Sequence, residues 1–215
     1  MSDVVKRPYD ASRRQDQARR TRARVIESAT ELFVEHGYGA TSIAAIAKHA
    51  GVAPQTIYGA FGTKAALLGE AIGVAMAGDD EPVAIFDRPD AQAVLRAPGP
   101  SEAATAYARV SARLLERAGR LIGAADGAAQ QDPELVPLWI EGHKLRLADM
   151  RRTAKAFADA GFLREGLTVE QATDLLWITG SPDAYRAFTV IRGWSPARYE
   201  RWLAATVARD VLRPD

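Results

Sequence analysis

Residues 55–58 read Gln-Thr-Ile-Tyr and place three hydrogen-bonding side chains within about one turn of a helix. A glutamine amide pairs bidentately with adenine, and a threonine contacts a phosphate or the methyl group of thymine. Tyr58 adds a hydroxyl that can reach the sugar–phosphate backbone. Lys64 follows at the expected start of the next helix, where the helix dipole disfavours a cation unless an anion binds beside it. These residue types favour contact with DNA; the alternative for Lys64 is a solvated surface lysine.

The helix that would position these side chains follows from the residues around them. Pro54 suits its first position, where a fixed φ is useful and the missing N–H is not needed. Ile57 and Phe61 lie one turn apart and face inward. This leaves outward Gln55, Thr56, Gly59 and Ala60, with Tyr58 on the flank. Gly59 would cost about 1 kcal/mol relative to alanine. A close approach of the helix backbone to DNA would account for it, and chance tolerance of a small residue is the alternative.

A second helix precedes this one. Thr41 and Ser42 are N-cap candidates, apolar residues recur at positions 43, 46, 47 and 50, and Gly51 ends the pattern. Residues 41–61 therefore read as helix, short turn and helix. This is the helix-turn-helix layout, in which the second helix enters the major groove. On spacing alone, a generic helical hairpin is the alternative.

Charge is unevenly distributed along the 215 residues. The net charge is +1, but residues 1–68 hold ten Lys and Arg against six acids, and the remainder holds 18 against 21. A basic head on an acidic body suits a protein that places one end on a polyanion. We predict a flexible basic arm at residues 1–19, a DNA-binding domain at 20–68, and a second domain at 69–215. The arginines of the arm are expected to enter the minor groove.

The segment from Thr21 to Leu68 resembles the N-terminal domain of the TetR family of transcriptional repressors. The resemblance is carried by GY-x-x-T-S, I-A-x-x-A-G-V and T-I-Y-x-x-F-x-x-K, within 48 contiguous residues. It implies that Thr56, Tyr58 and Lys64 contact operator phosphates or nearby bases, and that Gln55 lies at the groove.

One departure from the family pattern affects base reading. Many members carry an aromatic residue and a histidine where this chain has Gly59 and Ala60, so those phosphate contacts cannot be carried over. The complete set of residues expected at DNA is Thr41, Ser42, Pro54, Gln55, Thr56, Tyr58, Gly59, Ala60 and Lys64.

The rest of the chain reads as helical. Residues 78–100 are expected to form a loop or linker, and helices are expected from Ser101 onward, with no segment of strand alternation. The predicted fold is all-α: a three-helix helix-turn-helix head and a helical bundle, with about nine to ten helices. The tail from Asp174 resembles the C-terminal domain common in actinobacterial members. The family pattern implies a homodimer whose C-terminal domain holds a small effector, so residues 69–215 are expected to form an effector-binding and dimerisation domain.

Two further sets of residues are proposed in this C-terminal region. The last helix has large apolar residues every four positions, which suits a subunit interface, although intramolecular core is the alternative. The interface candidates are Leu176, Tyr185, Phe188, Tyr199, Trp202, Leu203 and Val207. The effector candidates, placed on helices that line the pocket in the family, are Tyr107, Asp126, Gln130, Trp139, His143 and Trp177. A solvated histidine is the alternative for His143.

Other functions find little support. The chain has no cysteine and no short motif typical of nucleotide-binding or hydrolytic enzymes, and its three histidines lack metal-ligand spacing. We expect no catalysis, cofactor or metal. No apolar stretch approaches the roughly 20 residues that cross a bilayer, so the cytoplasm and no membrane partner are expected. A DNA-binding regulator or architectural protein without an effector, and a ligand-binding module that does not bind DNA, stay open as alternatives.

Overall fold

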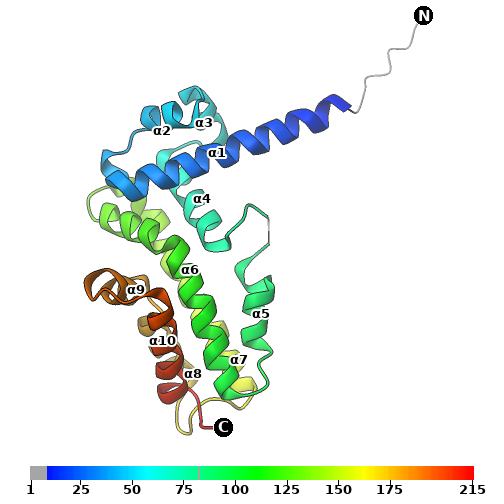
Figure 1. Cartoon of the computed structure of the whole chain (residues 1–215), viewed down its shortest axis with the longest axis vertical. Coiled ribbons are helices and arrows are strands. Elements are labelled where there is room, and N and C mark those ends of the chain that lie inside the picture. The colour runs from blue at the N-terminus through cyan, green and yellow to red at the C-terminus, as the bar shows by residue number, and fades with distance from the viewer. Residues whose placement is uncertain (1–8, 82) are drawn as a thin grey trace, which may run out of the picture. The chain divides into compact units, whose positions relative to one another are not determined.

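The computed structural model describes residues 9–81 and 83–215, and the side chains from residue 13 onward (Figure 1). The chain divides into two compact units, Met1–Ala71 and Ile72–Asp215. Ten α-helices, α1 to α10, account for most of the described residues, which contain no strand. The predicted all-α class is confirmed. The division falls three residues after the predicted end of the DNA-binding domain at residue 68.

The N-terminal unit is built on α1 (Tyr9–Ala40), α2 (Ile43–Ala50), α3 (Pro54–Phe61) and the first half of α4 (Lys64–Ala77). Its apolar residues recur at helical spacing, and burying that face removes it from water. The side chains at its centre, with at most 1% of their surface exposed, are Val25, Ala29, Phe33, Ile46, Ala47, Ile57, Leu67, Leu68 and Ala71.

The flexible arm predicted at residues 1–19 is wrong for residues 9–19, which belong to α1. Residues 9–36 contain no glycine or proline, and the basic stretch is rich in Arg, Gln and Ala, which favour helix. Residues 13–20 have no apolar stripe because they do not pack against the rest of the N-terminal unit, and all of them are exposed. Residues 1–8 lie outside the described residues.

Glycine and serine residues determine where α1 is interrupted and where α2 begins and ends. Gly37 interrupts α1 with a φ of 80°. Ser42 is the N-cap of α2, and its hydroxyl accepts a hydrogen bond from the Ala45 N–H at 3.1 Å. Gly51 ends α2 in the left-handed conformation, with φ 65° and ψ 41°, a region that other residues adopt at a cost. These caps fix the turn between α2 and α3.

The C-terminal unit is a helical bundle in which α10 packs on α6, and α7 packs on α8. The expected loop at 78–100 is wrong in its second half, because α5 begins at Pro89 and buries Ala91 and Val94. A π-helical stretch at Ala187–Ile191 follows α9. The helices of this unit beyond α4 are α5 (Pro89–Leu95), α6 (Pro100–Ala129), α7 (Val136–Asp159), α8 (Val169–Thr179), α9 (Pro182–Arg186) and α10 (Pro196–Asp210).

Among the described residues, no single helix is long and apolar enough to cross a membrane. Helices α3 and α4 reach the length and apolar composition of a membrane span only when they are counted together, and the chain bends between them.

Two glycine substitutions should move stability in opposite directions. Gly51→Ala should lower the free energy of unfolding by about 1 kcal/mol, because an L-residue is strained in the left-handed region. Gly59→Ala should raise it by about 0.5–1 kcal/mol, since Gly59 is helical and an added Cβ would meet no atom within 4 Å. Chemical denaturation followed by circular dichroism measures both. A loss of stability in Gly59→Ala would contradict the open space at that position.

Candidate nucleic-acid interface and effector site

Helix α3 presents one buried and one exposed face. Ile57 and Phe61 are 1% and 9% exposed, and Pro54 begins the helix as predicted. The remaining positions from 55 to 60 are exposed, and Tyr58 keeps 54% of its surface accessible. The predicted inward and outward faces are therefore confirmed, whereas DNA contact by the outward residues stays a prediction.

Thr41 does not belong to the exposed face. Its side chain is 3% exposed, and its hydroxyl lies 2.8 Å from the Gly37 carbonyl oxygen and 3.1 Å from that of Leu32. The expectation that Thr41 contacts DNA is wrong, because its hydroxyl fastens the start of α2 to the end of α1. The neighbouring Ser42 is exposed.

Lys64 has protein partners at the position where a phosphate was expected. Its ammonium donates to the carbonyl oxygens of Tyr38, at 3.0 Å, and Thr41, at 3.1 Å. It also lies 3.9 Å from the centre of the Tyr38 ring. These acceptors offset the unfavourable dipole, so that dipole does not require a phosphate. Phosphate contact by Lys64 stays a prediction, and its observed role is to join α4 to the junction of α1 and α2.

Arg22 is a second connecting residue, which the sequence did not single out. Its guanidinium pairs with Glu70 at 2.8 Å and donates to the Ala60 carbonyl oxygen at 3.3 Å. The same group stands 4.5 Å from the centre of the Phe61 ring. Carbonyls at the end of a helix lack helical partners, so Arg22 satisfies one of α3 while linking α1 to α4. No spacing in the sequence signals these partners.

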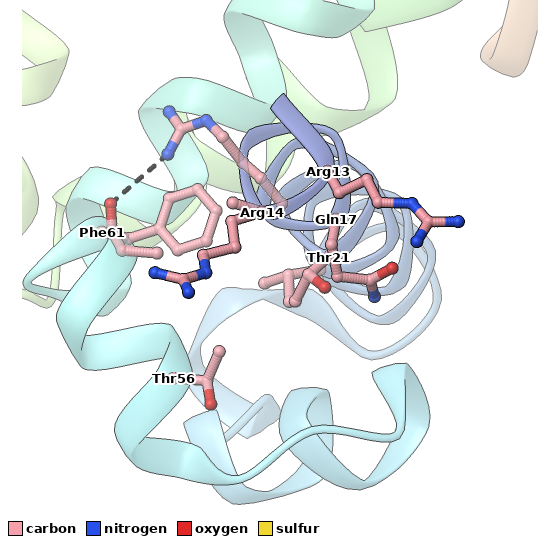
Figure 2. A pocket seen from close by; sticks show the side chains of 10 residues that line it. Arg13, Arg14, Gln17, Thr21, Thr56 and Phe61 are labelled. Carbon is pink, nitrogen blue, oxygen red and sulfur yellow. Dashed lines mark hydrogen bonds between the residues drawn. The ribbon is translucent and has the colours of Figure 1, made fainter. Parts of the chain in front are cut away.

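A groove of about 500 Å³ runs between α1 and α3 (Figure 2). Arg13, Arg14 and Gln17 line it from α1, and Thr56 lines it from α3. The groove thus joins the basic stretch of α1 to the exposed face of α3.

In the C-terminal unit, three of the predicted effector residues form a ring cluster. The His143 ring lies 4.5 Å from that of Trp139, its neighbour on α7, and 5.9 Å from that of Trp177 on α8. Asp126 joins them from α6: burial raises the pKa of its carboxyl, while His143 and a hydrogen bond with Trp139 act in the opposite direction. The structure therefore brings together four of the six.

Arg146 completes this cluster and was missed. Its guanidinium stands 4.0 Å from the centre of the Trp177 ring and donates to the Trp177 carbonyl oxygen. Burial lowers the pKa of Arg146. Positions 139, 143 and 146 follow the i, i+4, i+7 pattern of one helix face, which is the sequence signal that could have included Arg146.

The other two effector candidates lie elsewhere. Tyr107 is 4% exposed, its hydroxyl lies 3.3 Å from the Leu176 carbonyl oxygen, and burial raises its pKa to about 12. It is thus a core residue. Gln130 is exposed at the end of α6. A hollow of about 270 Å³ lies between the end of α4, α5 and α6, and none of the six candidates lines it.

The predicted dimer interface is wrong for four of its seven residues. Leu176, Tyr199, Leu203 and Val207 are 0% exposed and belong to the core of the C-terminal unit. Their apolar stripe faces the chain's own helices, and a side chain without accessible surface cannot contact a second subunit.

The other three interface candidates pack around the Tyr199 ring. Tyr185, Phe188 and Trp202 are half-buried there, with ring centres 4.9, 6.1 and 5.6 Å from that of Tyr199. Other large apolar side chains of the same unit are exposed: Ile178 at 62%, Val190 at 68% and Ile191 at 76%.

A helix-turn-helix unit with an exposed second helix, followed by an all-helical bundle, defines a class of DNA-binding regulators. Residues 25–71 match the model of the bacterial regulatory proteins of the tetR family. The part of the chain that this model covers therefore belongs to the tetR family of bacterial regulatory proteins. No curated protein sequence matches it.

Solved structures share this fold over most of both chains. A Mesorhizobium loti protein assigned to the TetR family is 25% identical, with a TM-score of 0.64 over 88% of this chain and 94% of that one. NalD of Pseudomonas aeruginosa, the secondary repressor of the MexAB-OprM multidrug efflux pump, is 22% identical, with a TM-score of 0.69 over 92% and 100%. FadR of Bacillus subtilis, in complex with stearoyl-CoA, is 21% identical, with a TM-score of 0.68 over 87% and 97%.

Replacing Lys64 should weaken the fold even without DNA. In Lys64→Met the carbonyls of Tyr38 and Thr41 lose a charged donor, which should lower the free energy of unfolding by about 1–2 kcal/mol. Lys48→Met, at an exposed lysine of α2, is the control and should cost less than about 1 kcal/mol. Chemical denaturation gives both values. An unchanged free energy of unfolding, together with a salt dependence of DNA binding flatter by about 0.9 for each bound subunit, would instead assign Lys64 to a phosphate.

Proposed function

We propose that this chain is a sequence-specific transcriptional repressor that binds its operator as a homodimer and releases it when a small molecule binds the C-terminal unit. The observation that carries the DNA-binding part is the exposed face of α3, held outward by the burial of Ile57 and Phe61. NalD, which shares the fold, is a repressor, and this likeness favours repression. The cytoplasm, where the chromosome lies, is the proposed location.

Base reading is assigned to the first turns of α3. Gln55 is exposed there and can pair bidentately with adenine. Thr56 and Tyr58, also exposed, carry hydroxyls suited to phosphate oxygens. Gly59 and Ala60 leave the later part of the face flat, so it can approach the base edges closely but offers them no side-chain hydrogen bonds.

A homodimer is proposed because a small head makes few base contacts by itself. Two heads reading half-sites about 34 Å apart would double those contacts. We place the subunit interface on the exposed apolar residues Ile178, Val190 and Ile191, because large exposed apolar groups mark interaction surfaces. This replaces the buried stripe of α10 that the sequence suggested.

The effector site is proposed at the cluster of Trp139, His143 and Trp177, with Asp126 and Arg146 beside it. Flat aromatic surfaces and a few charged groups suit an organic molecule that has both an apolar and a polar part. FadR, with the same fold, was solved with stearoyl-CoA, which supports a ligand site in a bundle of this kind. The competing function is a regulator that has no effector.

The DNA-binding proposal is tested with DNA that flanks the chain's own coding region. The purified protein should retard such a fragment at low salt, and failure to retard any would contradict the proposal. Gln55→Ala should then reduce discrimination at one base position of each half-site by about 1–3 kcal/mol. Thr56→Ala should weaken binding to all sequences alike. Competition assays on single-base operator variants separate the two results, and a uniform loss in Gln55→Ala would assign Gln55 to the backbone.

The interface proposal is tested by adding a charge. Ile191→Asp should convert dimer to monomer in analytical ultracentrifugation and weaken operator binding at least about 100-fold, because the heads then bind separately. Leu145→Asp, at a residue of α7 that is 59% exposed, is the control and should leave the dimer intact. A dimer that persists in Ile191→Asp would place the interface elsewhere.

A further inference from the structure

We propose that the N-terminal part of α1 is a second DNA-binding element, which holds one strand of the sugar–phosphate backbone in the groove that it forms with α3. The inference rests on the proposed function, because it takes α3 to lie in the major groove. It adds a contact surface that the helix-turn-helix does not contain.

The groove has one wall from each helix. Arg14 reaches from α1 towards α3, and Gln17 and Thr21 line the groove from α1 (Figure 2). Thr56, on the exposed face of α3, lies on the opposite wall. A helix in the major groove is flanked by phosphates on both sides. The strand on the α1 side of α3 would therefore lie between the two walls, within reach of guanidinium, amide and hydroxyl donors.

The charge of this stretch is complementary to that strand. Residues 13–24 hold six arginines and a single acid, Asp16. Residues 13–20 are all exposed, so burial in the unit does not explain this composition. Arg22 is committed to Glu70 and the Ala60 carbonyl oxygen, and it fixes the position of α1 against α3. The basic turns before it are thereby held beside the DNA-reading helix.

The helical conformation decides which part of the DNA this stretch contacts. A helix with its side chains is about 10–12 Å wide, whereas the minor groove is about 6 Å wide. The expected entry of a flexible arm into the minor groove therefore does not apply to residues 9–19, which are helical. As a helix, this stretch lies over the backbone, where arginine binds phosphate oxygens.

The dependence of operator affinity on salt tests the proposal. Each phosphate contact contributes about 0.9 to the slope of log K against log salt, so losing one contact per head of a dimer should flatten the slope by about 1.8. We expect this change in Arg14→Ala, together with an affinity at least about tenfold lower near 0.1 M salt. Arg20→Ala is the matched control: it removes an exposed cation from the same helix, at a position that does not line the groove. It should flatten the slope by less than half as much.

A second variant tests the need for a helix. Ala18→Pro should break α1 between its basic turns and its packed part, and it should flatten the slope as much as Arg14→Ala. Circular dichroism and thermal unfolding verify that the head remains folded. If Arg14→Ala flattens the slope and Ala18→Pro does not, the arginines act from a flexible arm and the groove proposal is overturned.

The remaining outcomes separate this inference from the proposed function. If the unaltered protein binds duplex DNA with no salt dependence, or not at all, the proposed function itself fails. If it binds normally and Arg14→Ala equals Arg20→Ala in slope, only the second DNA-binding element is overturned.

Discussion

The ammonium group of Lys64 joins α4 to the end of α1 and to the turn that leads into α2, and the arrangement of these elements depends on it. It binds the carbonyls of Tyr38 and Thr41, where α1 ends and the chain turns into α2. The Tyr38 carbonyl also accepts a hydrogen bond from the Thr41 N–H at 3.2 Å, and carbonyls near a helix end are costly to leave unsatisfied. The hydroxyl of Thr41 fastens the same junction from the other side. Because α2 carries α3 through a short turn, these contacts determine where the exposed face of α3 points.

The helices of the head could be predicted from sequence, but these connections could not. Burial follows a period of 3.6 residues, so Ile57 and Phe61 were assigned correctly to the inward face of α3. Lys64 and Thr41 bond to backbone carbonyls, which every residue has, so no residue type marks the partner. A lysine at the start of a helix has the same pattern whether it binds a phosphate or a carbonyl. The helix of residues 9–19 was missed for a related reason: periodicity reports burial, and an unburied helix has none.

In the C-terminal unit, the apolar stripe of α10 did not show whether its residues face the core of the same chain or a second subunit. Tyr199, Leu203 and Val207 recur every four residues whether their partner is the same chain or another. The exposed Val190 and Ile191 lie in the π-helical stretch, where the wider turn shifts the register of successive side chains. Trp139, His143 and Trp177 of the ring cluster were predicted because the family resemblance places them on helices that line its pocket. The face of α7 that carries Trp139 and His143 also carries Arg146.

The open space beside Gly59 has a consequence for how such a regulator could acquire a new operator. A Cβ added there meets no atom of the protein within 4 Å, and Ala60 beside it is also exposed. Under the proposed function, a larger residue at position 59 would extend towards the base edges without repacking the core that holds α3 in place. Changes of base preference and loss of stability are thus uncoupled at this part of the helix. Under the proposed function, the exposed face of α3 can diverge between related chains while the head that carries it stays the same.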